Sequence, residues 1–110
     1  MKIFITGVAG FLGSHLADLM ISEGHTVAGN DNMIGGYMDN VPQNVEFYQI
    51  DCCDLENMTK AMQGCDIVYH TAATAYEGLS VFSPVLVTRN IFEASVTTIT
   101  AAIRLSLIHI

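Results

Sequence analysis

Residues 2–13 read Lys2-Ile-Phe-Ile-Thr-Gly-Val-Ala-Gly-Phe-Leu-Gly13, an apolar run followed by glycines at every third position. The apolar run predicts a buried strand, after which Gly7 would lie in a tight turn. Gly10 would let the backbone approach a pyrophosphate, and Gly13 would let the next helix pack closely on the strand. That helix would direct its partly positive N-terminus at the anion. The stretch therefore predicts a phosphate-binding turn.

Strand-like and helix-like segments alternate after this turn. We expect strands over residues 2–6, 26–30, 45–49 and 66–70, and helices over residues 11–23, 55–63 and 84–103. This alternation predicts an α/β fold, a Rossmann-type doubly wound parallel sheet with right-handed crossovers, truncated after about four strands. The length of 110 residues suits one domain, and the hydrophobic content of 51% suits strands buried on both faces.

Each predicted helix carries apolar residues at helical spacing, which predicts the face that packs on the sheet. These residues are Leu12, Leu16, Leu19 and Met20 in the first helix, Leu55, Met58 and Met62 in the second, and Ile91, Phe92, Ser95, Ile99, Ala102 and Ile103 in the third. Asp54 and Ser83 are the expected N-caps of the second and third helices. Many β-branched residues make the third helix a poor helix former, so tertiary packing must stabilise it.

Asp31 falls at the end of the second predicted strand, 18 residues after Gly13. A carboxylate at this place in a dinucleotide-binding unit accepts hydrogen bonds from the adenosine ribose, and its charge repels the 2′-phosphate of NADP. Glycines, helix and acid together favour dinucleotide binding, with an ordinary βαβ unit as the alternative. The long segment 30–44 lacks periodicity and is either functional or mobile.

These motifs resemble the opening of the extended short-chain dehydrogenase/reductase family, the NAD-dependent sugar-nucleotide epimerases and dehydratases. The glycine spacing in Thr6-Gly-Val-Ala-Gly-Phe-Leu-Gly-Ser-His-Leu16 is that family's. Its further marks follow in order as Asp31-Asn32, Asp51-Cys-Cys-Asp54, His70-Thr-Ala-Ala73, Ser83-Pro84 and Asn90. The resemblance covers residues 1–104 and implies an NAD-binding domain of an enzyme that acts on a nucleotide-sugar, with the whole protein a homodimer.

The resemblance also implies which residues contact NAD. They are Gly7, Gly10, Phe11, Leu12, Gly13, Asp31, Asn32, Asp51, Cys52, Ala72, Ala73 and Asn90. Asp51 would reach the adenine amino group beside the Cys52 backbone, and the two alanines would border the nicotinamide-side ribose. Three of these residues keep a second interpretation: Asn32 as a polar loop residue, Asp51 as a turn former and Asn90 as a core hydrogen-bonding residue.

The chemistry of this family depends on a Tyr-x-x-x-Lys motif, which this sequence does not contain. We therefore name no catalytic residue and expect the 110-residue chain to be inactive, although the whole protein would be an enzyme. We interpret His70 as a half-buried structural histidine rather than a catalytic one. Two other functions remain open: a non-catalytic NAD-binding or redox-sensing module, and a related ketoreductase or steroid-type dehydrogenase.

Composition narrows the partners and the compartment. The net charge of −7, with only four Lys and Arg residues, argues against nucleic acid or an anionic membrane as a partner. The sequence has no apolar run of transmembrane length and no signal peptide, so we expect a cytoplasmic protein. The three cysteines lack the spacing of a metal site, and reduced thiols are expected.

The last six residues, Leu105-Ser-Leu-Ile-His-Ile110, match the translation of a transposon-end adapter used in DNA sequencing. We therefore expect residues 105–110 to be a non-native tail that follows the NAD-binding domain of residues 1–104. A fifth strand is the alternative interpretation of this segment, because its composition would allow one.

Overall fold

The computed structural model describes residues 1–73 and 81–105. The strands there form one parallel sheet in the order β3-β2-β1-β4, from β1 (Lys2–Thr6), β2 (Thr26–Asn30), β3 (Glu46–Tyr48) and β4 (Ile67–His70). Thr6 pairs with both Asn30 and His70, and Asn30 pairs with Tyr48. The carboxyl ends of all these strands therefore meet at one edge of the sheet. This architecture confirms the predicted α/β class.

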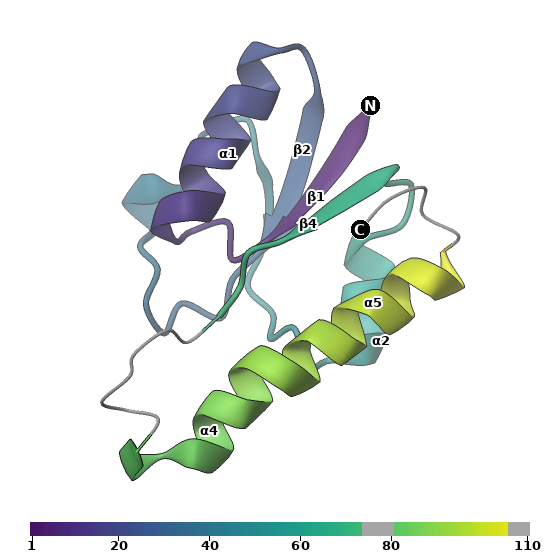
Figure 1. The fold of residues 1–110 in the computed structure, drawn as a ribbon. Helices are drawn as coiled ribbons and strands as arrows, with labels where there is room; N and C mark the ends of the chain where they lie inside the picture. Colours follow the sequence, from purple (N-terminus) through teal and green to yellow (C-terminus); the bar gives the residue numbers. More distant parts are fainter. Residues whose placement is uncertain (74–80, 106–110) are drawn as a thin grey trace.

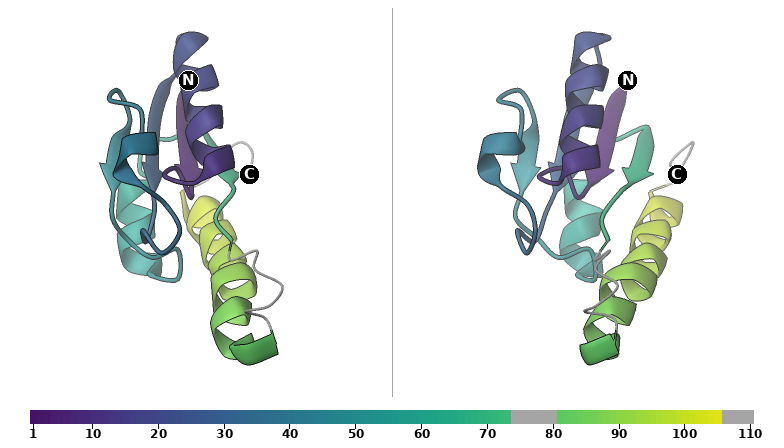
Figure 2. Two further views of the ribbon diagram at one scale, coloured as in Figure 1. Left: turned by 90° about the vertical axis from the view of Figure 1, so that its left-hand side faces the viewer. Right: turned by 60° about the vertical axis from the view of Figure 1, so that its left-hand side comes forward.

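Helices cover both faces of the sheet (Figures 1 and 2). Helix α1 (Phe11–Ser22) packs on one face, and α2 (Leu55–Ala61) and α5 (Ala94–Arg104) pack on the other. Side chains alternate along β1, so that Ile3 and Ile5 join the α1 core while Phe4 joins the core beneath α2 and α5. Met58 and Met62 are fully buried in that second core, as their spacing predicted.

The predicted face of α1 is correct only in part. Leu16 and Met20 are partly buried and pack against the core on the sheet, whereas Leu12 and Leu19 are 63% and 50% exposed. The residues that α1 buries most deeply are Gly13, Ser14 and Ala17. The cause is the close approach of α1 to the turn before it: a Cβ at Gly13 would lie 2.2 Å from the Gly7 carbonyl oxygen. Because residue 13 must face the turn, neighbours at positions 14 and 17 face the sheet with it.

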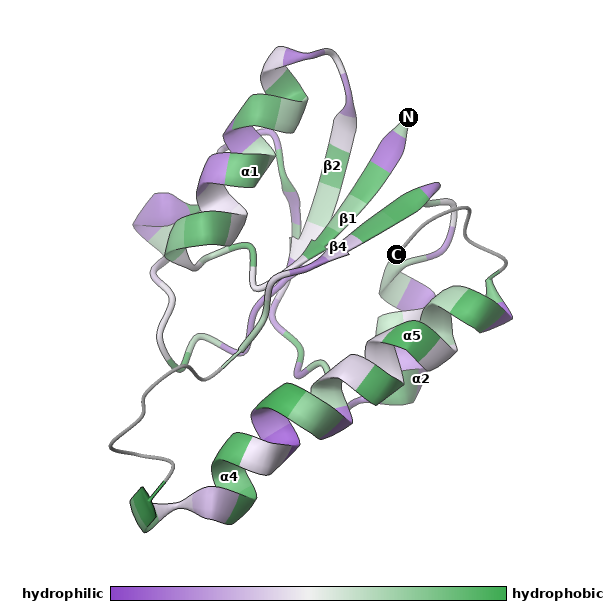
Figure 3. Ribbon diagram, in the orientation of Figure 1, coloured by the Kyte–Doolittle hydropathy of each residue, from purple (hydrophilic) through white to green (hydrophobic). Residues whose placement is uncertain are grey.

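The last helical segment is one continuous rod that contains a π-helical turn. It runs through α4 (Pro84–Thr88), the π turn η2 (Arg89–Glu93) and α5 (Figure 1). Small residues form its buried face: Ala94, Thr98, Ala101 and Ala102. The predicted apolar face was right at Ala102 but wrong at its large residues, because Phe92 and Ile103 are 67% and 69% exposed. Figure 3 shows hydrophobic segments along the ribbon of this long helix.

The two expected N-caps differ. Asp54 caps α2, because its carboxylate accepts a hydrogen bond from the Asn57 amide at 3.2 Å. Ser83 occupies the N-cap position of α4, with Pro84 next, but its side chain makes no capping hydrogen bond. The backbone carbonyl of Ser83 does accept the Val87 amide, so α4 begins where expected without the side-chain contribution.

Candidate cofactor-binding site

The glycine turn has a geometry that side chains would block. Gly7 has a φ of +70°, which disfavours L residues, and a Cβ there would lie 2.9 Å from the Ala72 Cα. The Gly7 and Val8 amides both donate to the Asn30 carbonyl, which ties the turn to the end of β2. These contacts place the turn at the carboxyl edge of the sheet.

The N-terminus of α1 is free to receive an anion. Gly10 is its N-cap and offers no side chain, and the first turn contains no acidic residue. The first amides of any helix lack an intrahelical carbonyl partner and carry a partial positive charge. A phosphate group therefore fits here, because neither a capping side chain nor a carboxylate of α1 competes for these amides.

Asp31 is 8% exposed and binds the glycine turn. Its carboxylate accepts the Ala9 amide at 3.1 Å through one oxygen and the Met33 amide at 2.8 Å through the other. Each carboxylate oxygen has room for a second hydrogen bond, so a ribose hydroxyl can still donate to this group. Met33 has a φ of 67°, a left-handed conformation that turns the chain sharply after Asp31.

The segment after Asp31 folds back onto Ala9 and forms one wall of the site. The Ala9 carbonyl accepts the Tyr37 amide at 3.2 Å and the Asn40 side-chain amide at 3.3 Å. Gly36 lies so close that a Cβ there would be 2.8 Å from the Ala9 Cβ. These contacts hold Gly36, Tyr37 and Asn40 against the glycine turn. The side chain of Asn32 accepts the Ile34 amide, a local turn contact.

Asp51 and Cys52 follow β3 at the same edge. The Asp51 carboxylate accepts the Cys53 amide at 2.8 Å, and Asn30 donates to the Ile50 carbonyl at 2.9 Å and to the Cys52 sulfur at 3.4 Å. Burial raises the pKa of the Cys52 thiol, and burial likewise raises the pKa of Cys53. Both thiols therefore stay protonated at neutral pH and are poor nucleophiles.

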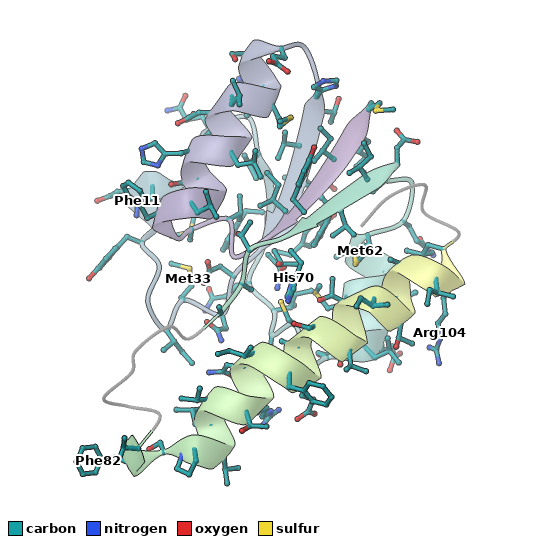
Figure 4. The ribbon with its side chains drawn as sticks, in the orientation of Figure 1. Phe11, Met33, Met62, His70, Phe82 and Arg104 are labelled. Atoms are coloured by element: carbon teal, nitrogen blue, oxygen red, sulfur yellow. The ribbon has the colours of Figure 1, made fainter. Side chains whose placement is uncertain are left out.

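The segment after β4 lies against the glycine turn. The Thr6 hydroxyl oxygen accepts the Thr71 amide at 3.0 Å and the Ala72 amide at 3.2 Å. His70 is half-buried and has partners on both ring nitrogens, Thr6 and Ser95, which is the structural environment expected for it. Burial lowers its pKa. Figure 4 shows His70 between the end of β4 and the long helix.

The π turn brings the long helix into the site. Asn90 lies within η2 and is buried, and both Asn90 and Ala94 line the cleft described below. A π turn inserts an extra residue into the helix and so changes the direction of the side chains after it. Because such turns recur at functional sites, this one supports a role of Asn90 at the site.

A cleft of about 380 Å³ joins these elements at the carboxyl edge of the sheet. Of the residues expected to contact the cofactor, it is lined by Gly7, Gly10, Phe11, Asp31, Asn32, Asp51, Cys52, Ala72, Ala73 and Asn90. Leu12 and Gly13 do not line it: Leu12 is exposed and Gly13 is buried beneath the turn. The lining residues include no Lys or Arg among those described, so backbone amides would hold a phosphate here.

Six residues of this cleft were not among the expected NAD contacts, although four of them lie in segment 30–44 and Thr71 lies in the quoted motif after β4. They are Asn30, Ile34, Gly35, Gly36, Thr71 and Ala94. The position of Asn30 at a strand end was a usable signal, because carboxyl ends of parallel strands share one edge. The contribution of Ala94 depends on the π turn, which the sequence pattern did not indicate.

Further features of residues 1–73 and 81–105 concern metal-ligand groups, long apolar helices and cysteines. No group of three His, Cys, Asp or Glu side chains there could hold a metal ion. No helix in this part of the chain has the length and apolar character needed to cross a membrane. All three cysteines are free. The expected tail falls mainly on residues 106–110, which lie outside the described ranges.

The chain is similar to known proteins in both sequence and structure. The model of the NAD dependent epimerase/dehydratase family matches residues 3–109. UDP-glucose 4-epimerase of Thermotoga maritima, solved with UDP-glucose, superposes with a TM-score of 0.94 at 31% identity over 97% of this chain. The Thermus thermophilus UDP-glucose 4-epimerase complex with NAD gives a TM-score of 0.92 at 32% identity over 97% of this chain.

A curated relative of a different activity is also similar. The 2-alkyl-3-oxoalkanoate reductase of Shewanella oneidensis is 39% identical over 72 residues, which cover 66% of this chain and 18% of the reductase. The chain spans 35% of the length of each of the two epimerase structures. The similarity therefore concerns one part of these larger proteins.

Proposed function

This chain belongs to the NAD-dependent epimerase/dehydratase family, and we propose that its cleft binds NAD. The observation that carries the proposal is the convergence of the glycine turn, the open N-terminus of α1 and the buried Asp31 on one cleft. The pyrophosphate would lie against the amides of the glycine turn, and the adenosine ribose would lie beside Asp31. The Thermus thermophilus epimerase is a relative solved with NAD.

We propose further that the whole protein acts on a nucleotide-sugar. Bound NAD supplies a hydride acceptor for a sugar hydroxyl carbon, and a base must take the hydroxyl proton. This sequence has no Tyr-x-x-x-Lys to supply that base, so the proposal places the reaction in a longer protein. The support is the Thermotoga maritima epimerase solved with UDP-glucose. Finding a Tyr-x-x-x-Lys downstream of Arg104 in the parent gene would favour this proposal.

A reductase of ketone substrates is the second candidate. The observation that favours it is the 39% identity to the 2-alkyl-3-oxoalkanoate reductase. Both candidates share the cofactor cleft and differ in the part of the protein that holds the substrate. Turnover assays of a full-length parent protein with nucleotide-sugars and with ketones would separate them.

We also propose a cytoplasmic homodimer. Three free cysteines suit a compartment that keeps thiols reduced. The exposed apolar residues of α4 and α5 offer a surface that a second copy could cover.

Cofactor preference tests the proposed site through Asp31. We expect the chain to bind NAD at least about tenfold more tightly than NADP, because the 2′-phosphate would lie beside a buried carboxylate. Asp31→Asn keeps the shape of the side chain but removes its charge, and should narrow this ratio. Asp39→Asn is the matched control, because Asp39 is exposed in the short helix η1 (Met38–Asn40) and does not line the cleft. Tighter binding of NADP in calorimetric titrations would refute the assignment.

A further inference from the structure

The hydrogen bonds around Thr6 fix the protonation of His70. The Thr6 hydroxyl oxygen accepts two backbone amides, those of Thr71 and Ala72, and it lies 2.7 Å from His70 Nδ1. A hydroxyl oxygen has two acceptor positions and one hydrogen. Because both acceptor positions are used, the hydroxyl hydrogen must point at Nδ1, which therefore accepts.

The other ring nitrogen continues the same chain of hydrogen bonds. Since Nδ1 accepts, the proton of the neutral imidazole lies on Nε2, which donates to Ser95 Oγ at 3.0 Å. The Ser95 hydroxyl then donates to the Ile91 carbonyl within the long helix. Every donor in this chain finds one acceptor, and the direction runs without a break from the Thr71 and Ala72 amides to Ile91.

The Thr6–His70–Ser95 hydrogen-bond chain links three segments that line the cleft: the glycine turn, the segment after β4 and the long helix. Thr6 immediately precedes Gly7, and it holds the Ala72 backbone where a Cβ at Gly7 would touch it. His70 ends β4 and leads into Thr71 and Ala72, which line the cleft. Ser95 follows Ala94, another lining residue, on the long helix.

We infer that the Thr6–His70–Ser95 hydrogen-bond chain holds His70 as the neutral Nε2–H tautomer and makes it a positioning residue for the cofactor cleft. His70 sets the spacing between the glycine turn and the long helix. The part of this inference that concerns the cofactor rests on the proposed binding of NAD; the tautomer does not. An imidazolium would place a second donor against the Thr6 hydroxyl and displace one of the two amides.

Ring nitrogen chemical shifts test the tautomer directly. In the 110-residue chain labelled with ¹⁵N at neutral pH, we expect His70 Nδ1 to resonate as an unprotonated nitrogen and Nε2 as a protonated one. A protonated Nδ1, or an average of the two tautomers, would overturn the inference. This measurement needs no cofactor, so its outcome is independent of whether NAD binds.

A double-mutant cycle tests the positioning role. We expect His70→Leu and Ser95→Ala each to weaken NAD binding by about threefold to tenfold. The double variant should bind NAD no less tightly than the single variant that has the lower affinity. Losses that multiply, or no loss, would contradict the inference. Ser95→Thr keeps the hydroxyl and should restore affinity. Ser22→Ala is the matched control, because the Ser22 hydroxyl donates within α1 to the Leu19 carbonyl.

Folding is followed separately in every variant through its urea midpoint. If the wild-type chain binds no NAD, the proposed function fails. The double-mutant cycle at positions 70 and 95 is then measured through the free energy of unfolding instead of the affinity for NAD. Coupling between positions 70 and 95 in that cycle supports the hydrogen-bond chain, and strict additivity refutes it.

Discussion

The three glycines of the turn perform different tasks although they stand at equal spacing. Gly7 provides a left-handed conformation, Gly13 provides space beneath the Gly7 carbonyl, and Gly10 leaves the helix N-terminus open. The conformation at Gly10, with φ −82° and ψ 177°, is one that any residue adopts. The sequence predicted the tasks of Gly7 and Gly13 from the geometry of a strand, a turn and a helix, whereas the approach of the Gly10 backbone to a pyrophosphate stays a prediction.

Alanine substitutions should separate two of these tasks. Gly13→Ala would place a Cβ 2.2 Å from the Gly7 oxygen, and we expect it to lower the free energy of unfolding by about 1–3 kcal/mol or more. Gly10→Ala meets the same oxygen at 3.3 Å, so we expect a smaller loss of stability but clearly weaker NAD binding. Urea unfolding and calorimetric titration of both variants provide the check. Equal destabilisation would contradict this separation.

His70 should make stability depend on pH. Burial lowers its pKa below the ordinary 6.5, so the unfolded chain takes up a proton at a higher pH than the folded chain. The contribution of neutral His70 to the free energy of unfolding is complete above pH 6.5. It is lost as the pH falls through the pKa that His70 has in the folded chain. When the pH is lowered from about 7.5 to about 5.5, we expect the urea midpoint of the wild type to decrease by more than the urea midpoint of His70→Asn. Equal falls would exclude His70 as the source.

Residues that depend on distant partners were the hardest to predict. Asp31 was predictable because its distance from the glycines carries the signal, and the structure places it against Ala9. The hydroxyl of Thr6 gains its role from amides about 65 positions away in the chain. Nothing near Thr6 in the sequence indicates those partners.

At the scale of elements, their order and type followed from the sequence, but helix rotation did not. Periodicity located α1 and α5, yet their large apolar residues Leu19 and Ile103 are exposed while Ala17 and Ala101 are buried. Close packing on the sheet selects small side chains at the contact, as Gly13 shows in α1. A hydrophobicity pattern weighted toward large residues therefore predicts only part of the buried face, such as Leu16 and Met20 in α1.

The two N-cap positions allow a comparison within one chain. We expect Asp54→Ala to destabilise the protein by about 0.5–2 kcal/mol, because the Asn57 amide would lose its acceptor. Ser83→Ala should cost less than about 0.5 kcal/mol, because the Ser83 side chain makes no capping bond. Chemical denaturation measures both. A larger effect at Ser83 would show that α4 is capped in a way the described contacts do not include.

At the scale of the molecule, the long helix exposes many large apolar residues, and Figure 3 colours several of its segments as hydrophobic. Val85, Phe92 and Ile103 are exposed there, and the chain spans about a third of the length of the epimerase structures it resembles. An exposed apolar face of this kind favours association.

We therefore expect the chain to self-associate at micromolar concentration and the double variant Val85→Ser/Phe92→Ser to do so much less. Leu19→Ser changes an exposed leucine on α1 and should leave association unchanged. Sedimentation velocity over a concentration series measures all three proteins. Association that persists in the double variant would place the contact elsewhere and remove the support for pairing through this face.

The fully buried Ala9 has a consequence for the free energy of local opening. Its amide donates to the Asp31 carboxylate, and its carbonyl accepts the Tyr37 amide and the Asn40 side-chain amide, so three hydrogen bonds hold the 31–40 segment to the glycine turn. The segment cannot separate from the turn unless these bonds break together. The backbone amides of Ala9 and Tyr37, 28 positions apart, should therefore exchange with deuterium at the same opening free energy, as members of one cooperative unit.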